Sequence, residues 1–321
     1  MQSDKELESL LSQAGPRPVP SAEDMAAARD LVRDEWHSVV RRRRRNRLLG
    51  LAAAATIVVA AFVTFDMSQT RDARAVQVAT IERSFGSIYL LGDRSELQET
   101  NDLIAVMQGQ TVVTGSKSGV AFNLGKGLSL RSDARTRIEF ADPATVFLHD
   151  GRVYVDAAAA EHTILRIESE HGVVEHVGTQ YMMNVDKREL VVSVREGKVA
   201  IEGSYHDATV VPGKRVRLSG TRRPDFANVP LSGEHWQWVE ALAPAADFDG
   251  RSVHEFLEWV SRETGLVLEF ESPAAERLAL AETLNGRIDT APTDALRVWM
   301  MGIDLDWRIE GGVIYISEMK R

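Results

Sequence analysis

Cysteine is absent from the 321-residue sequence. Its absence excludes disulfide frameworks, zinc sites with thiolate ligands, iron–sulfur clusters and cysteine nucleophiles. It leaves the compartment open, since many exported bacterial domains also lack disulfides. No glycine-rich loop precedes a predicted helix, and Ser118 and Ser193 stand outside any Gly-x-Ser-x-Gly context. We therefore predict a protein that binds partners, with no cofactor, no metal and no enzymatic activity.

The overall composition is that of a globular protein. Hydrophobic residues make up 44% and charged residues 26% of the chain, which argues against wholesale disorder. The length favours two or three domains. The net charge of −9 argues against direct binding to nucleic acid, since the phosphate backbone is also negative.

The positive charge is unevenly distributed. Residues 1–47 hold ten Lys and Arg against eight Asp and Glu, and residues 48–65 hold no charge. Most of the positive excess lies in one short run, which consists of Arg41, Arg42, Arg43, Arg44, Arg45 and Arg47.

A long apolar run follows these arginines directly. Residues 48–65 read LLGLAAAATIVVAAFVTF, and fifteen of the eighteen are hydrophobic. As a helix they would rise about 27 Å, close to the thickness of a bilayer core. The flanking arginines predict a single membrane span with a cytoplasmic N-terminus and an exported C-terminus. The alternative is a cleaved signal peptide, for which Ala73-Arg74-Ala75 resembles a cleavage site.

The pattern of residues 1–47, the segment before the predicted membrane span, indicates an amphipathic helix. Ser21 and Asp24 resemble a capping box at its start. One face then carries residues at spacings of three and four: Met25, Ala28, Val32, Trp36 and Val39. A lone helix of this length is marginal in water, so this face is a candidate partner-binding surface. It could also pack on residues 4–12 or fray without a partner.

The remainder divides into two regions with different sequence patterns and a linker between them. Residues 76–220 carry about a dozen short β-branched or alternating runs separated by turn signals such as Asp150-Gly151 and Glu196-Gly197, which predicts an all-β sandwich or roll. Residues 221–246 are predicted to be a linker with a helical turn near 235–238. Residues 247–321 predict a small α+β domain.

Two helices are predicted in that C-terminal domain. Ser252 and Glu255 form a capping box for the first, and Gly265 is placed to end it. The second is expected from about Pro292 to Met301, and Gly311-Gly312 should turn a closing pair of strands. The predicted order is strand, helix, strand, strand, helix, strand, strand.

One group of histidines is a candidate metal site. His171 and His176, with His162 nearby in sequence, could converge on a hairpin. No diagnostic ligand spacing supports that interpretation, and we do not favour it.

Residues 76–220 contain a series of short motifs in a fixed order. Val113-Thr114-Gly115 comes first, followed by LHDGRVYVD at residues 148–156. Gly178-Thr179-Gln180-Tyr181 then leads to VVSVREGKVAI, residues 191–201, and Pro212-Gly213 comes last. This series resembles the FecR family of bacterial membrane-spanning signal transducers, in which the first two motifs are similar to the upstream strands, the next two to the closing hairpin and the last to the turn that follows it.

The C-terminal domain resembles the short N-terminal domain of secretins and TonB-dependent receptors, notably at Leu284 to Ile288 and Thr293 to Leu296. The two resemblances together imply a regulator of the bacterial inner membrane that controls a sigma factor, as an anti-sigma factor or as an activator. Its periplasmic part would receive the signalling domain of a TonB-dependent outer-membrane receptor, and its cytoplasmic segment would hold an extracytoplasmic-function sigma factor, as in the control of iron-chelate uptake. The alternative is a membrane-anchored envelope-binding or scaffold protein without a sigma-factor partner.

Overall fold

The computed structural model describes residues 76–91, 97–99, 105–157 and 164–319. The predicted cytoplasmic segment 1–47 and membrane span 48–65 lie outside these residues. Within the described ranges, none of the helices combines the length and the apolar character needed to cross a membrane.

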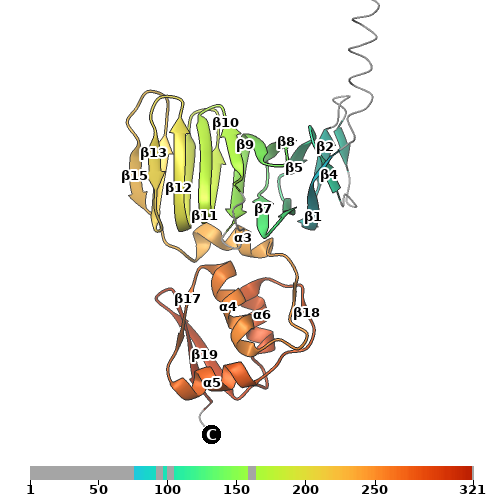
Figure 1. Ribbon diagram of the computed structural model, residues 1–321, viewed down its shortest axis with the longest axis vertical. Helices are drawn as coiled ribbons and strands as arrows, with labels where there is room; N and C mark the ends of the chain where they lie inside the picture. Colours follow the sequence, from blue (N-terminus) through green and yellow to red (C-terminus); the bar gives the residue numbers. More distant parts are fainter. Residues whose placement is uncertain (1–75, 92–96, 100–104, 158–163, 320–321) are drawn as a thin grey trace, which may run out of the picture. The chain divides into compact units, whose positions relative to one another are not determined.

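Fifteen strands in the described residues form one sheet that is folded into two layers (Figure 1). Layer A contains, in order, β15 (Asp225–Asn228), β14 (Lys214–Leu218), the first half of β12 (Leu190–Gly203), the second halves of β11 (Gly172–Val185) and β9 (Thr145–Asp156), β7 (Leu128–Ser132), β6 (Gly119–Gly125), β1 (Gln77–Phe85) and β4 (Ala105–Met107). Layer B contains β13 (Ala208–Val210), the other halves of β12 and β11, β10 (Arg166–Ser169), the first half of β9, β8 (Arg137–Asp142), β5 (Thr111–Thr114), β2 (Ile88–Leu91) and β3 (Leu97–Glu99). The prediction of a β-rich fold is thus confirmed.

Three long strands pass from one layer to the other, and here the sequence-based prediction of turns was wrong. Asp150-Gly151 and Glu196-Gly197 lie inside β9 and β12, so VVSVREGKVAI is one continuous strand instead of a hairpin. Gly151 has φ 102°, and a Cβ there would lie 2.4 Å from Thr136 Oγ1. Glycine therefore lets each strand bend sharply while its two halves keep different neighbours.

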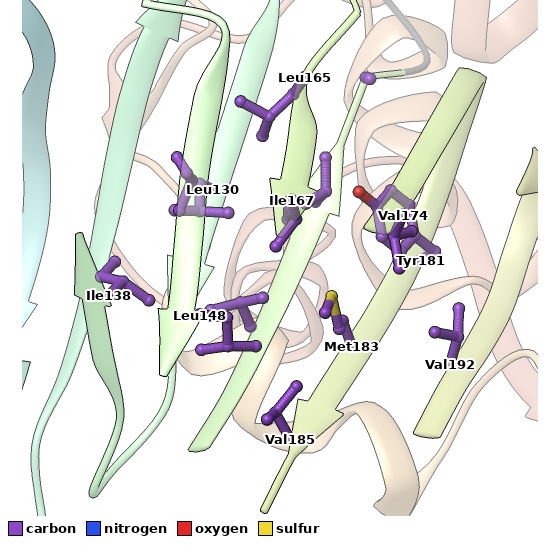
Figure 2. Close-up of a cluster of buried hydrophobic side chains, with 14 of the residues drawn as sticks. Leu130, Ile138, Leu148, Leu165, Ile167, Val174, Tyr181, Met183, Val185 and Val192 are labelled. Carbon is purple, nitrogen blue, oxygen red and sulfur yellow. The ribbon is translucent and has the colours of Figure 1, made fainter. Parts of the chain in front are cut away.

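The hydrophobic core lies between the two layers (Figure 2). Alternate residues of each strand point inward, as Leu130, Leu148 and Val192 do. The rings of Phe122 and Phe140, from layers A and B, meet edge to face with centroids 5.1 Å apart. The alternating pattern that predicted strands therefore marks the inner face of each layer.

His171 and His176 do not converge on a metal. His176 is buried, and its Nε2 accepts a hydrogen bond of 3.1 Å from the Leu165 backbone N–H. His171 Nε2 instead lies 2.7 Å from the Asp186 carbonyl oxygen. Among the described residues no group of His, Cys, Asp or Glu is arranged to hold a metal ion. The two rings diverge because β11 carries His176 into the core while His171 stays in the preceding turn.

Acidification is expected to destabilise the fold through His176. Burial lowers the pKa of this imidazole from 6.5 to about 4. Between pH 6.5 and pH 4 the imidazole is therefore protonated in the unfolded chain and neutral in the folded chain. The free energy of unfolding falls as the pH falls through this range, by up to about 3 kcal/mol. Urea unfolding of the full chain at several pH values measures the loss. His176→Gln keeps an acceptor for the Leu165 N–H and should flatten this dependence, whereas His206→Gln should leave it unchanged; equal slopes in both variants would contradict the assignment.

The segment predicted as a linker contains secondary structure. Residues 221–246 include β15, the 3₁₀ turn η1 (Glu234–Trp236) and α3 (Gln237–Ala241). β15 extends layer A by pairing with β14, so the sheet continues past residue 220. The predicted helical turn corresponds to η1 and α3.

The C-terminal module, residues 246–318, has its own hydrophobic cluster. Its elements are β16 (Ala246–Asp247), α4 (Val253–Thr264), β17 (Val267–Phe270), α5 (Pro273–Ala281), β18 (Arg287–Ile288), α6 (Pro292–Trp299), β19 (Leu305–Glu310) and β20 (Val313–Glu318). β20 pairs in parallel with β17 and antiparallel with β19, and β16 pairs with β18.

The ends of α4 follow the sequence signals, whereas α5 was missed. The Glu255 backbone N–H donates to Ser252 Oγ at 3.2 Å, and the Ser252 N–H donates to Glu255 Oε2 at 2.9 Å, which completes the capping box. Gly265 ends α4 with φ 72°. α5 begins with Ser272 as N-cap and Pro273 in its first turn, which is a typical helix start. The sequence pattern did not predict this helix, because it is short and its apolar face consists largely of alanine.

Candidate functional site

The residues predicted to bind a sigma factor lie outside the described part of the chain. They are Met25, Ala28, Val32, Trp36 and Val39, and the arginines at 41–45 and 47 lie outside it as well. The described residues instead bring together a polar cluster where the C-terminal module meets layer A. We call this contact the seam.

The outer face of layer A supplies one side of the seam. Strand register places Arg131 beside Tyr154 and Tyr154 beside Met182, and all three side chains point away from the core between the layers. Trp236 and Val239 of η1 and α3 pack on Tyr154 and Met182 as a small apolar cluster. An outward face that would ordinarily meet water is therefore covered.

Arg195 reaches the seam because β12 carries a bulge. Tyr181 pairs with Val194 and Gln180 with Glu196, so Arg195 is an extra residue between two successive pairs. Such bulges redirect a side chain. The Arg195 guanidinium lies 4.4 Å from the centroid of the Trp236 ring. Burial lowers its pKa.

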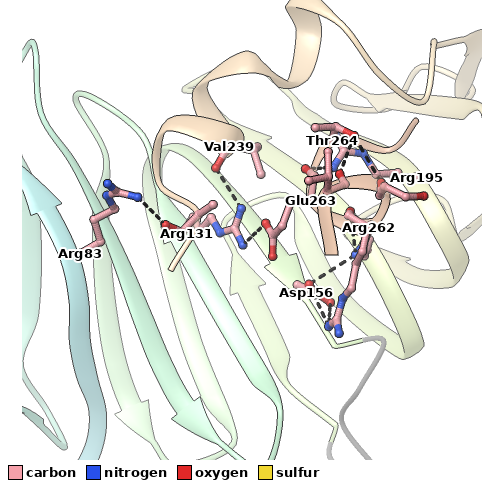
Figure 3. A network of polar contacts seen from close by, with 12 residues as sticks. Arg83, Arg131, Asp156, Arg195, Val239, Arg262, Glu263 and Thr264 are labelled. Carbon is pink, nitrogen blue, oxygen red and sulfur yellow. Dashed lines mark hydrogen bonds and ion pairs between the residues drawn. The ribbon is translucent and has the colours of Figure 1, made fainter. Parts of the chain in front are cut away.

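The C-terminal end of α4 supplies the other side. Arg195 Nη1 donates to the Glu263 carbonyl oxygen at 3.0 Å, and its Nε donates to the Leu231 carbonyl oxygen at 2.8 Å (Figure 3). The last carbonyls of a helix lack intrahelical partners and carry partial negative charge, so a cation is favourable there. Arg195 thus binds a helix end and the linker together.

A buried ion pair lies beside this contact. Arg131 Nη2 is 2.6 Å from Glu263 Oε2, and Arg131 Nη1 donates to the Val239 carbonyl oxygen at 2.9 Å. The two side chains are 1% and 9% exposed. Burial is the largest single influence on Arg131 and lowers its pKa, but the charge of Glu263, its hydrogen bond and the other nearby groups together outweigh burial, so the pKa is raised.

A second ion pair and a flanking arginine complete the seam. Arg262 Nη2 contacts both carboxylate oxygens of Asp156, at 2.9 and 3.0 Å. Gln180 Nε2 donates to the same carboxylate at 3.3 Å. Arg83 donates to the carbonyl oxygens of Ala243 at 2.7 Å and Asp289 at 2.8 Å. Four arginines therefore connect layer A, the linker and the module.

Two buried polar atoms of the seam arginines have no hydrogen-bond partner in the described structure. They are Arg131 Nε and Arg195 Nη2. A buried unsatisfied group costs about 1–3 kcal/mol. The hydrogen bonds and ion pairs of the other seam atoms make the seam a directional, polar contact at the end of α4, unlike the apolar cores on either side.

Gly265, at the end of α4, lies in close contact with Arg195 of layer A and Leu231 of the linker. A Cβ at this residue would lie 2.2 Å from the Leu231 carbonyl oxygen and 2.6 Å from Arg195 Nε. We expect Gly265→Ala to lower the free energy of unfolding of the full chain by more than the roughly 1–2 kcal/mol of a left-handed alanine alone.

Gly250→Ala is the matched control for this prediction. Gly250 has φ 74°, against 72° at Gly265, but a Cβ at Gly250 would meet no atom within 4 Å. Urea unfolding of both variants separates backbone strain from steric clash. An equal loss in the two variants would show that the close approach contributes nothing.

The sequence did contain a signal for the seam. Arg131, Asp156 and Arg195 are charged residues within otherwise apolar strands, in LSLRS, VYVD and VVSVREG. Such residues on a sheet usually face water, so composition alone gave no reason to place them under a helix.

Comparison with known proteins identifies the sheet. Residues 110–200 match the sequence model of the family described as FecR protein. The chain carries a FecR domain. This confirms the family resemblance, and the matched segment holds Arg131, Asp156, Gln180 and Arg195 of the sheet side of the seam, whereas Arg83 lies before it. None of the curated proteins compared with the chain matches it.

Two solved structures are similar to this FecR-domain protein at a low level. Both are of a candidate anti-sigma factor from Parabacteroides distasonis ATCC 8503, with 14% and 13% identity and TM-scores of 0.34 and 0.35. Each alignment covers 65% of this chain and 99% of the other. At these TM-scores the likeness supports no statement on the fold or the function of this chain.

Proposed function

We propose that this chain is a single-pass inner-membrane regulator of the anti-sigma type. Its periplasmic FecR domain and C-terminal module receive a signal from an outer-membrane receptor of the TonB-dependent class, and its cytoplasmic segment 1–47 holds an extracytoplasmic-function sigma factor. The observation that carries the proposal is the FecR match at residues 110–200 in a chain whose sequence also contains an arginine run followed by an eighteen-residue apolar stretch.

The physical requirements of such a regulator agree with the sequence. The arginines favour a cytoplasmic position for the preceding segment. The amphipathic face of that segment has no core of its own to join, so a protein partner would bury it. The described structure bears on the periplasmic half alone, where the seam connects the FecR domain with the module. Control of iron-chelate uptake is the form of regulation that the family resemblance suggests.

Capture from a cytoplasmic extract tests the cytoplasmic half of this proposal. The full chain in mild detergent serves as bait, with Trp36→Ala as the test variant and Trp307→Ala, in β19, as the matched control. We expect a sigma factor to be retained by the wild type and by Trp307→Ala and to be lost with Trp36→Ala. Retention of no sigma factor by the wild type would instead favour the envelope scaffold.

A further inference from the structure

A groove of about 760 Å³ opens beside the seam, and both sides of the seam contribute to its wall. Gln180, Arg195 and Glu196 come from the FecR domain, and Leu231 comes from the linker. The rest of the lining belongs to the region from α4 to α5 and includes Glu258, Leu266, Val267, Leu268, Phe270 and Glu276. The volume lies within the range of about 300–1,000 Å³ that is usual for binding clefts.

One wall of the groove contains an unpaired strand edge. Within the described strands β17 pairs only with β20. The Val267 N–H donates to the Gly312 carbonyl oxygen and the Glu271 N–H donates to the Ile316 carbonyl oxygen, so alternate residues of β17 bond towards β20. In a parallel ladder the intervening residues point their backbone groups the opposite way. The N–H and C=O groups of Leu268 and Phe270 therefore face the free edge.

The exposed charges around this edge are mainly acidic. Both arginines in the groove are engaged, Arg262 with Asp156 and Arg195 with backbone carbonyls. Glu196 and Glu276 are exposed, and in the described structure no cation lies within ion-pair distance of either. Glu258 is 61% exposed, with His254 Nδ1 at 3.8 Å. The groove thus combines an apolar strand edge with acidic walls.

We propose that this groove binds an extended peptide segment whose side chains alternate between apolar and basic. The segment adds to β17 through the backbone of Leu268 and Phe270, its apolar side chains contact Leu266 and Val267, and its lysines or arginines meet Glu196 and Glu276. Because the walls come from both sides of the seam, the site is complete only while the module is docked on the FecR domain.

Binding of short synthetic peptides to the full chain tests this site directly. The probe is a fluorescent peptide of alternating valine and lysine, compared by anisotropy with an alternating valine–glutamate peptide and with a valine–lysine peptide methylated on every second backbone nitrogen. We expect the first to bind, and the other two to bind at least about tenfold more weakly, since one has the wrong charge and the other cannot form the strand ladder.

Variants of the protein locate the site. Glu196→Gln combined with Glu276→Gln should weaken the valine–lysine peptide about tenfold, because each exposed charge pair changes affinity severalfold. The matched control is Glu202→Gln combined with Glu282→Gln, exposed residues in β12 and at the end of α5 that lie outside the groove. It should bind as the wild type does.

Opening the seam should abolish binding without unfolding either core. Glu263→Gln removes the negative charge that pairs with Arg131, at a residue that does not line the groove. Near-ultraviolet circular dichroism reports whether the two cores persist. Equal effects of the groove and control variants, or unchanged binding by the methylated peptide, would overturn the proposal.

The inference rests on the proposed function only in taking the natural ligand to be a protein partner. Because the peptide experiment contains no sigma factor, failure of sigma-factor capture and failure of this site are separate results.

Discussion

Replacing Arg131 with methionine is expected to lower the free energy of unfolding of the full chain by about 3–5 kcal/mol, since it leaves a buried carboxylate without its cation. Glu263 is 9% exposed and its Oε2 lies 2.6 Å from Arg131 Nη2. The Val239 carbonyl oxygen loses a donor at the same time. Urea unfolding followed by tryptophan fluorescence measures the change.

Two further variants separate the buried pair from charge effects in general. Arg131→Met combined with Glu263→Leu should recover most of the loss, because replacing both members of a buried pair by apolar residues is often neutral. Arg308→Met removes an exposed pair of 2.7 Å with Glu271 and should cost only about 0–1 kcal/mol. If Arg131→Met cost no more than Arg308→Met, the buried pair would contribute nothing to the seam.

The β-rich fold could be predicted because it depends on a local pattern. Alternation of inward apolar residues, as in Leu128 and Leu130 of β7, is visible in any short window of sequence. What a window cannot show is whether a glycine reverses the chain or bends it. At Gly151 and Gly197 the outcome depends on which strands lie beside each half of β9 and β12, and this is a long-range property.

The seam could not be predicted, although each of its residues is conspicuous. Arg131 and Glu263 are 132 positions apart, and the direction of Arg195 depends on a bulge in the pairing of β11 with β12. Neither fact follows from the composition of a strand. By contrast, the capping box of α4 and its glycine end are local, and the sequence located both correctly. The helix that meets the seam was thus foreseen, but the surface it meets was not.

Trp236 holds the linker against the sheet, and its loss should be about as severe as that of Arg131. The side chain is 0% exposed, and its Nε1–H donates to the Pro230 carbonyl oxygen at 2.7 Å. Its ring meets Tyr154 edge to face with centroids 6.1 Å apart and supports the Arg195 guanidinium. We expect Trp236→Ala to cost about 3–5 kcal/mol, from lost burial and the cavity that remains.

In Trp236→Ala the shape of the unfolding curve should change as well as its midpoint. The FecR domain and the C-terminal module have separate hydrophobic clusters, and the seam is what couples them. Without Trp236, Arg195 loses the surface that orients it towards the end of α4, so the two cores should unfold in separate steps instead of together. Hydrogen exchange would then show α4 losing protection before β9 and β11.

Two controls make this result specific to the contact. Trp236→Phe keeps an aromatic ring on Tyr154 but loses the hydrogen bond to Pro230, and should cost about 1–2 kcal/mol while unfolding stays a single step. Trp238→Ala removes a half-buried ring that contacts Arg152, with the guanidinium 4.9 Å from its centroid, and leaves Arg195 in place. If Trp238→Ala also separated the two cores, general loosening of the linker, and not the position of Arg195, would control the coupling.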